Sequence, residues 1–86
     1  MNYMLSSHAE EELILRKIPR RFVDGLLQSP QQIISEHRHR KAYQSQVDFG
    51  DGRIFLLRAI IDEKVDPAVV VTVYRTRKIK KYWRTP

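Results

Sequence analysis

Residues 69–83 read V-V-V-T-V-Y-R-T-R-K-I-K-K-Y-W. The first part of this stretch is rich in β-branched and aromatic residues, which favour a strand on a half-buried sheet. The second part carries basic and then aromatic side chains: Arg75, Arg77, Lys78, Lys80, Lys81, Tyr82 and Trp83. A buried strand therefore continues directly into a cationic, aromatic segment, which is a rigid way to present positive charge and ring faces to an anionic polymer.

The composition is typical of one soluble globular domain. A chain of 86 residues has room for a single core, so we expect one domain over residues 1–86. Without cysteine the chain forms no disulfide and no thiolate metal site, which suits the cytoplasm. No apolar run approaches the ~20 residues of a membrane span, and no secretory signal is recognisable. We therefore expect a cytoplasmic protein that does not interact with a membrane.

The positive charge is concentrated near the C-terminus. The net charge is +6, and after Asp66 the chain has six basic residues and no acidic one. Such a basic stretch favours binding to a nucleic acid, or to an acidic protein partner that masks the charge.

The N-terminal part predicts a short strand at residues 2–5 and then a helix. Ser7 and Glu10 have the spacing of a capping box, in which each side chain accepts a hydrogen bond from a backbone N–H group of the other residue. The predicted buried face of this helix consists of Ala9, Leu13 and Ile14. We expect the helix to end near Ile18, because Pro19 disfavours the α conformation in the residue before it.

A second helix is predicted to begin at Pro19, a residue that suits the first helical position. Its apolar stripe consists of Phe22, Val23, Leu26 and Leu27. The Ser-Pro pair at residues 29–30 should end it. The two helices then form a hairpin whose apolar faces need a sheet to cover them.

The rest of the chain predicts that sheet. The expected strands are residues 32–36, 41–49, 53–61 and 68–77. Between them, residues 37–40 favour a charged turn, and the Gly-Asp-Gly sequence at residues 50–52 favours a tight one. The predicted fold is α+β, with an N-terminal helical hairpin packed on one face of an antiparallel sheet of three or four strands.

Alternation along the strands separates an apolar face, which should carry the helices, from a mixed face. On the last strand it places Val69, Val71 and Val73 on one face and Val70 on the other. The mixed face is expected to be available to solvent or to a ligand. Its polar and aromatic members are Gln44, Gln46, Arg58, Thr72, Tyr74 and Thr76.

Arg58 is the first candidate site residue, because an arginine in an apolar strand needs a partner. A phosphate fits the guanidinium fork, but an ion pair with Asp48 or Glu63 would also satisfy it. Tyr74 and Thr76 share its face. A tyrosine there can stack on an unpaired base or bind a phosphate, and it can equally pack against a neighbouring strand.

His8 is the most interesting single residue, because a histidine near a helix start can act as an acid or a base near neutral pH. It can also cap the helix or pack on the sheet. Arg53 either contacts a phosphate or is solvated at a hairpin end. Arg75, Lys78, Lys80 and Lys81 should attract RNA, although a solvated basic tail is common. Tyr82 and Trp83 either stack on bases or pin the tail to the domain.

No cofactor or metal site is predicted. The sequence H-R-H-R-K at residues 37–41 has two histidines, but interleaved arginines repel a dication, so a charged turn is the better interpretation. The chain has three glycines, two of them in one turn, and lacks a glycine-rich loop that could hold a phosphate.

Six short motifs occur in a characteristic order along nearly the whole chain. They are S-x-H-A at residues 6–9, R-x-I at 16–18, S-P at 29–30, G-R at 52–53, T-V-Y-R-T at 72–76 and K-K-Y-W at 80–83. This set resembles a family of small prokaryotic domains of unknown function, DUF4258. Two positions depart from the family pattern. Glu12 stands where members often have arginine, and Lys17 stands where they often have glycine.

That family is similar to the RelE, ParE and BrnT toxins, which share a helical hairpin on an antiparallel sheet. The resemblance implies a toxin of a toxin–antitoxin system, a metal-independent endoribonuclease that cuts mRNA, with ribosome-associated mRNA as one substrate, and that an acidic antitoxin inhibits. On this hypothesis the catalytic residues are His8, Arg58 and Tyr74. His8 or Tyr74 would transfer protons, while Arg58, together with Arg53 and Lys78, would neutralise the phosphate in the transition state. A non-catalytic module that binds nucleic acid or an antitoxin is the alternative, and a toxin acting on gyrase is a third.

Overall fold

The structure is a computed structural model, and it describes residues 2–85. Its elements are β1 (Tyr3–Leu5), α1 (Ser7–Leu15), α2 (Arg20–Gln28), β2 (Gln32–Ser35), the 3₁₀ helix η1 (His37–His39), β3 (Arg40–Asp48), β4 (Ile54–Asp62), β5 (Ala68–Thr76) and α3 (Ile79–Tyr82). The α+β prediction is confirmed: the two N-terminal helices pack on a mostly antiparallel sheet. Each predicted strand and helix exists, with ends that differ by a few residues.

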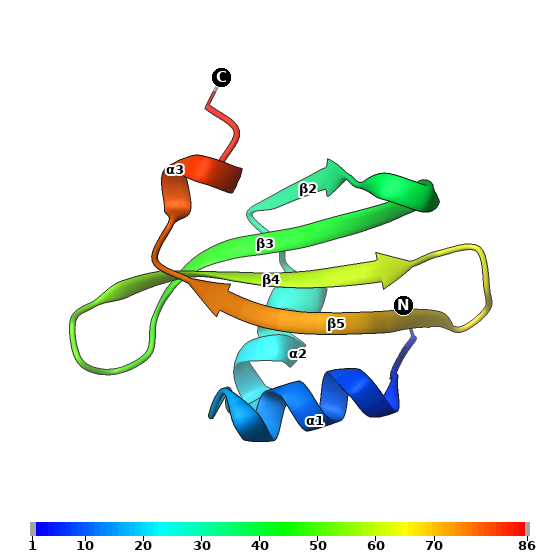
Figure 1. The fold of residues 1–86 in the computed structure, drawn as a ribbon, viewed down its shortest axis with the longest axis horizontal. Helices are drawn as coiled ribbons and strands as arrows, with labels where there is room; N and C mark the ends of the chain where they lie inside the picture. Colours follow the sequence, from blue (N-terminus) through cyan, green and yellow to red (C-terminus); the bar gives the residue numbers. More distant parts are fainter. Residues whose placement is uncertain (1, 86) are drawn as a thin grey trace.

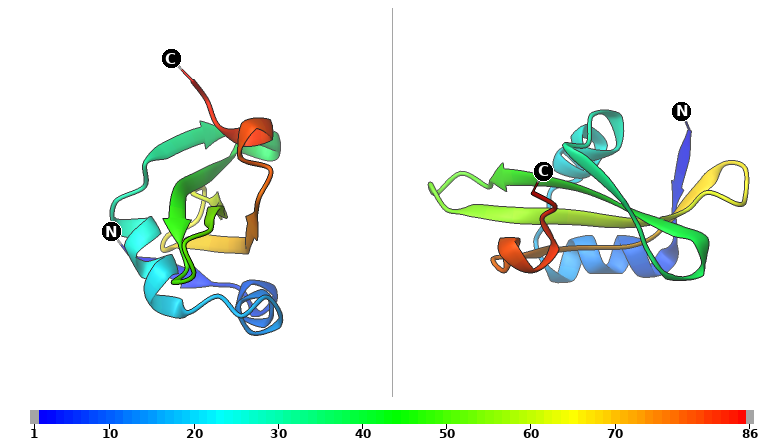
Figure 2. Two further views of the ribbon diagram at one scale, coloured as in Figure 1. Left: turned by 90° about the vertical axis from the view of Figure 1, so that its left-hand side faces the viewer. Right: turned by 90° about the horizontal axis from the view of Figure 1, so that it is seen from above.

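The sheet has five strands in the order β1-β5-β4-β3-β2, which is more than the three or four predicted. The three pairs of neighbouring strands from β2 to β5 are antiparallel, as expected. β1 is the exception, because it pairs in parallel with β5, with Tyr3 opposite Ala68. The sheet is strongly twisted, and α1 and α3 lie on different sides of its strands (Figures 1 and 2). Across residues 2–85, none of the helices has the length and apolar character needed to traverse a lipid bilayer.

The main core lies between α1, α2 and one face of the sheet. Ala9 and Leu13 of α1 and Val23 and Leu26 of α2 are buried there. From the sheet they meet Tyr43, Leu57, Ala59, Ile61, Val70 and Val73. The predicted apolar stripe of α2 is confirmed, with Phe22 and Leu27 partly buried at its margins.

A bulge in β5 changes which valines face the helices. Thr72 lies opposite Ile60 while Val70 lies opposite Ile61, so Val71 is an extra residue on this strand. One extra residue in a strand moves each side chain before the bulge to the opposite face of the sheet. Val70 and Val73 are therefore both fully buried under the helices. The prediction that Val70 points to the opposite face from Val73 is wrong for this reason.

The start of α1 is fixed by Ser6 and not by Ser7. The Ser6 Oγ accepts a hydrogen bond from the Ala9 backbone N–H at 3.0 Å and donates one to the Val71 carbonyl at 2.9 Å. The Ser6 backbone N–H also donates to the Val70 carbonyl at 3.0 Å. Ser6 thus caps the helix and ties it to the bulge in β5, whereas Ser7 is an exposed first residue of the helix.

Replacing Ser6 by alanine is expected to lower the free energy of unfolding by about 1–2 kcal/mol, because both the helix cap and the bond to the Val71 carbonyl are lost. Ser7→Ala is the matched control and should change stability by less than about 0.5 kcal/mol, since Ser7 is exposed. Urea unfolding followed by circular dichroism measures both. Equal losses in the two variants would contradict the assignment of the cap.

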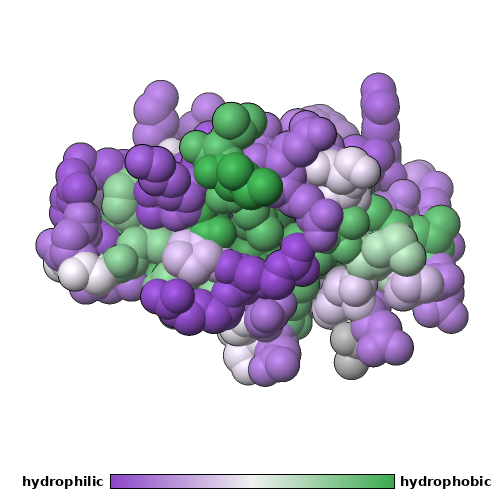
Figure 3. All heavy atoms as spheres, turned by 90° about the horizontal axis from the view of Figure 1, so that it is seen from below, coloured by the Kyte–Doolittle hydropathy of each residue, from purple (hydrophilic) through white to green (hydrophobic). Residues whose placement is uncertain are grey.

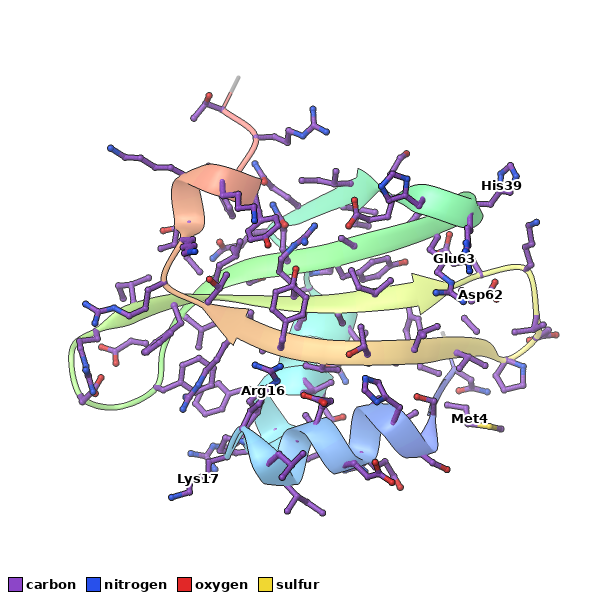
Figure 4. The ribbon with its side chains drawn as sticks, viewed as in Figure 1. Met4, Arg16, Lys17, His39, Asp62 and Glu63 are labelled. Atoms are coloured by element: carbon purple, nitrogen blue, oxygen red, sulfur yellow. The ribbon has the colours of Figure 1, made fainter. Side chains whose placement is uncertain are left out.

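The other end of α1 closes with a left-handed turn. The Ile18 N–H donates to the Leu13 carbonyl at 2.9 Å and the Lys17 N–H to the Ile14 carbonyl at 3.2 Å, the bond pair of a Schellman motif. Lys17 is accordingly at φ 54°, and its side chain projects from the end of α1 (Figure 4). Because the chain turns after Leu15, the buried face of α1 ends at Leu13, and Ile14 is 79% exposed. The prediction that Ile14 is buried is therefore wrong.

Replacing Lys17 by glycine is expected to raise the free energy of unfolding by about 0.5–1 kcal/mol. Glycine adopts the left-handed conformation without the Cβ clash that a lysine suffers, and this gain exceeds its greater freedom in the unfolded chain. Lys17→Ala removes the same side chain but keeps the Cβ, so it should give no such gain. If the alanine variant were stabilised as much as the glycine variant in urea, the backbone explanation would fail.

Candidate functional site

The candidate site lies on the face of the sheet opposite the main core. Four side chains occur in a row across neighbouring strands, because Gln32 pairs with Gln44, Gln44 with Arg58, and Arg58 with Tyr74. They alternate with core residues such as Leu57 and Ala59, so strand geometry alone sends them to this face. The alternation of the strands predicts this polar face correctly, but the face was expected to be open.

The C-terminal segment, residues 77–85, folds back over this row. Its helix α3 brings the Tyr82 ring to 4.2 Å from the Arg58 guanidinium carbon. Gln44 donates from Nε2 to the Tyr82 carbonyl at 3.2 Å. The Gln32 Nε2 donates to the Arg84 carbonyl at 2.5 Å, and the Gln32 Oε1 accepts from the Arg84 backbone N–H at 3.1 Å. The expectation that this face is available to solvent is therefore wrong at its centre, where Gln44 is fully buried and Arg58 is 3% exposed.

Arg58 tolerates this burial because each side of its guanidinium has a partner. Nε donates to the Gln44 Oε1 at 2.8 Å, Nη1 donates to the Tyr74 hydroxyl at 2.5 Å, and Nη2 lies 3.5 Å from the Glu36 carboxylate. The sequence suggested Asp48 or Glu63 as ionic partners, and that is wrong. Both are used elsewhere: Asp48 accepts from the glycine N–H groups of the β3–β4 turn, and Glu63 pairs with Lys41 and Tyr43.

Two tyrosines share this arginine and have different acid–base properties. Tyr74 and Tyr82 pack edge to face, with ring centroids 6.2 Å apart. Burial raises the pKa of Tyr74, an effect that Arg58 only partly opposes. The pKa of Tyr82 is lowered, first by its interaction with the Tyr74 hydroxyl and then by Lys81 and Arg58. The interaction between the two tyrosines thus raises the pKa of Tyr74 and lowers that of Tyr82.

Exposed cations surround this centre. Arg77, Lys78, Lys80 and Lys81 are exposed, and the Lys81 ammonium lies 5.2 Å from the Tyr82 ring centroid. The Thr76 Oγ1 accepts the Lys78 backbone N–H at 3.1 Å, which fixes the turn into α3. Among residues 2–85, no carboxylate forms a salt bridge with a cation of residues 75–84. We call Arg77, Lys78, Lys80 and Lys81 the basic rim.

The sequence profile of a domain of unknown function, DUF4258, matches residues 5–75. The chain belongs to this family. Searches of curated proteins and of solved structures find no match. The match covers the helical hairpin and strands β2 to β4 with nearly all of β5, but not α3 or most of β1. The residues of the basic rim therefore lie outside the part of the chain that matches the family.

Not all predicted site residues of this DUF4258 domain come together. Arg58, Tyr74 and Tyr82 are in contact, with Thr76 and three lysines of the basic rim beside them. His8 is on α1 with its side chain 59% exposed, and its ionic neighbour is Glu12 at 3.9 Å. Arg53 pairs with Asp51 at 2.6 Å in the β3–β4 turn, so it is at a solvated hairpin end. No hydrogen bond or ion pair within residues 2–85 joins His8 or Arg53 to Arg58.

Other residues matter here that the sequence did not single out. Gln32 and Glu36, which the sequence placed only in a strand, hold the C-terminal segment and the Arg58 charge. Gln32 lies on the same face as Arg58, two strands away, and that was the available signal, but its partner Arg84 is 52 residues away in sequence. No group of three histidine, aspartate or glutamate side chains able to bind a metal is found in residues 2–85.

Replacing Arg58 by alanine is expected to lower the free energy of unfolding by about 2–4 kcal/mol, because Gln44, Glu36 and the Tyr82 ring lose their shared partner in a buried place. Arg77→Ala removes the same charge from an exposed position and should cost less than about 0.5 kcal/mol. Urea unfolding compares the two. An Arg58→Ala loss below about 1 kcal/mol would show that the network is dispensable.

Proposed function

We propose that this DUF4258 domain is a toxin-like RNA-binding protein that cleaves RNA without a metal ion. The observation that carries the proposal is the contact of two tyrosines with Arg58 beside the basic rim: Tyr74 through its hydroxyl and Tyr82 through its ring. The opposite directions of their pKa shifts support it. Pairs of titratable groups whose environments separate their pKa values commonly mark an acid and a base. Here both groups lie next to cations that suit an RNA backbone.

The proposed chemistry assigns one proton transfer to each phenol. Tyr82 in its ionised form accepts the proton of the ribose 2′-hydroxyl, and the 2′-oxygen attacks the adjacent phosphorus. The bond from phosphorus to the 5′-oxygen breaks, and Tyr74 donates its proton to that oxygen. The products are a 2′,3′-cyclic phosphate and a 5′-hydroxyl. The Arg58 charge behind the two rings favours the phenolate of Tyr82 and the negative charge that develops on the phosphate.

The basic rim holds the substrate in this proposal. Lysines on a short helix supply charge without a fixed geometry, which suits contact with a phosphate backbone in any sequence. The substrate is mRNA, including mRNA on a ribosome, and the protein acts in the cytoplasm. The same unpaired cations would also fit an acidic antitoxin, which would inhibit the protein by covering the rim.

A second candidate function is binding without cleavage, and the burial of Arg58 favours it. The guanidinium is 3% exposed, and Gln44, Tyr74, Glu36 and the Tyr82 ring occupy its surroundings. A phosphate cannot contact it in this arrangement. On this alternative Arg58 is structural, and the basic rim binds RNA or an acidic protein with no chemistry.

Tyr82→Phe is expected to reduce cleavage of a synthetic single-stranded RNA by about 10²-fold or more, because it removes the proposed base and keeps the ring on Arg58. Tyr3→Phe is the matched control, since it removes a hydroxyl that contacts Tyr43 away from the site. Cleavage is measured by gel electrophoresis in the presence of a chelator. The wild-type rate should rise with pH, because the base acts when Tyr82 is deprotonated.

The outcomes separate the two candidates. If Tyr82→Phe cleaves as well as Tyr3→Phe, the assignment of the base is wrong. If the folded wild type binds RNA and does not cut it, the non-catalytic alternative replaces the first. In an inducible bacterial host, growth arrest with transcript loss supports cleavage. Arrest with altered DNA topology and intact transcripts would instead indicate a gyrase toxin.

A further inference from the structure

A second cationic feature lies at the end of the sheet, where β5 ends beside the β3–β4 hairpin (Figure 1). Three phenylalanines pack there, with ring centroids 4.7 Å apart for Phe22 and Phe49 and 5.8 Å apart for Phe49 and Phe55. The guanidinium carbon of Arg75 lies 4.6 Å from the Phe49 centroid and 4.9 Å from the Phe55 centroid. We call Arg75, Phe49 and Phe55 the arginine clamp.

The clamp fixes its arginine in one place. Arg75 lies opposite the buried Leu57 in the β4–β5 ladder, so its backbone is held in a paired strand. Its side chain is half-buried and held by two rings, which restricts a residue that is normally mobile. A guanidinium that is already ordered loses less entropy when it binds an anion than a free side chain does.

The hydrogen-bonding capacity of this arginine is unused within residues 2–85. No carboxylate pairs with Arg75 there, and its guanidinium donates no hydrogen bond to the protein. By contrast, Arg58 donates hydrogen bonds to Gln44 and Tyr74 and pairs with Glu36, and Arg53 pairs with Asp51. Stacking occupies the faces of a guanidinium, while the N–H groups at its edge can still donate hydrogen bonds. Their spacing matches two oxygens of a phosphate.

We propose that the arginine clamp is a preformed site for one phosphodiester group of an RNA strand, separate from the basic rim. Arg75 emerges on the side of β5 that faces the helices, whereas Arg58 and Tyr74 lie on the other side. Arg77 and Lys78 follow in the chain and lead from the clamp to the rim. A strand bound at both places passes around the end of β5.

The surrounding charge favours a polyanion over an isolated carboxylate. Arg21 lies over the Phe22 ring at 4.8 Å, which places a second cation on the same aromatic group. The nearby acidic residue Asp51 is already paired with Arg53. A polymer with one charge per nucleotide can meet several such cations at once, and an acidic peptide with scattered carboxylates matches the fork less regularly.

The proposal rests on RNA binding by the protein, and the experiment tests the two separately. Binding of a fluorescent single-stranded 2′-O-methyl RNA, which lacks the attacking hydroxyl, is followed by anisotropy over a range of KCl concentrations. The variants are Arg75→Lys, Arg77→Lys and the double variant Lys80→Ala/Lys81→Ala. Both arginine variants keep the charge, but only Arg75 has a clamp to lose.

Arg75→Lys is expected to weaken binding about three- to tenfold with an unchanged salt dependence, because the planar fork and the stacking are lost while the charge remains. Arg77→Lys should stay within about twofold of the wild type. The double lysine variant should bind more weakly, and its log–log salt slope should fall by about 0.7 for each lysine. Phe49→Leu, confirmed as folded by circular dichroism, should reproduce the loss seen for Arg75→Lys.

Three results would overturn the proposal. If Arg75→Lys binds as tightly as Arg77→Lys while the lysine double variant is impaired, RNA binding stands and the clamp is not a site. If poly-glutamate competes with Arg75-dependent binding better than RNA does, the clamp recognises carboxylates. If the wild type binds no RNA, the proposed function and the clamp both fail.

Discussion

The burial of the Arg58 guanidinium is the constraint on which the C-terminal third of the molecule depends. A charged group that is 3% exposed is stable only when its surroundings replace the water it has lost. Gln44, Tyr74 and Glu36 supply acceptors, and the Tyr82 ring supplies a polarizable face. Because Tyr82 comes from α3, the arginine determines where the C-terminal segment lies and where the basic rim is presented.

The same network explains why α3 exists as a helix of four residues. An isolated helix of that length is unstable in water, since its nucleation is not compensated by further turns. Its stability must therefore come from contacts outside itself. Those contacts are the bonds from Gln32 and Gln44 to the backbone of Arg84 and Tyr82, together with the stacking on Arg58. A buried polar row in the sheet thus replaces the apolar contact that usually orders a terminal helix.

How well the sequence predicts each feature of the fold depends on how far apart in the chain the interacting residues lie. The two N-terminal helices and the strands are local patterns, and they were predicted to within a few residues, whereas α3 was not predicted. The errors involve long-range constraints. Val70 was misplaced because the Val71 bulge is not encoded in the strand pattern, and Ser7 was chosen over Ser6 because the Val71 carbonyl that Ser6 binds lies far along the chain. The open face was predicted correctly as polar, but its cover, α3, depends on Tyr82 meeting Arg58 across 24 residues of sequence.

Glu12 departs from the pattern of the family that the chain resembles, and the structure shows which residue balances its charge. Where family members often have arginine, this acidic residue would reverse the local charge if it stood alone. It does not stand alone, because Glu12 forms an ion pair with Arg16 one turn later, and this arginine lowers the pKa of the carboxyl group. The pair is close to neutral, so Glu12 also offsets the positive charge of Arg16. The proposed acid–base pair is instead built from Tyr74 and Tyr82, which Glu12 does not contact through any hydrogen bond or ion pair within residues 2–85. Within residues 2–85, Glu12 is therefore a local feature of α1, and the hydrogen bonds and ion pair that hold Arg58 are formed without it.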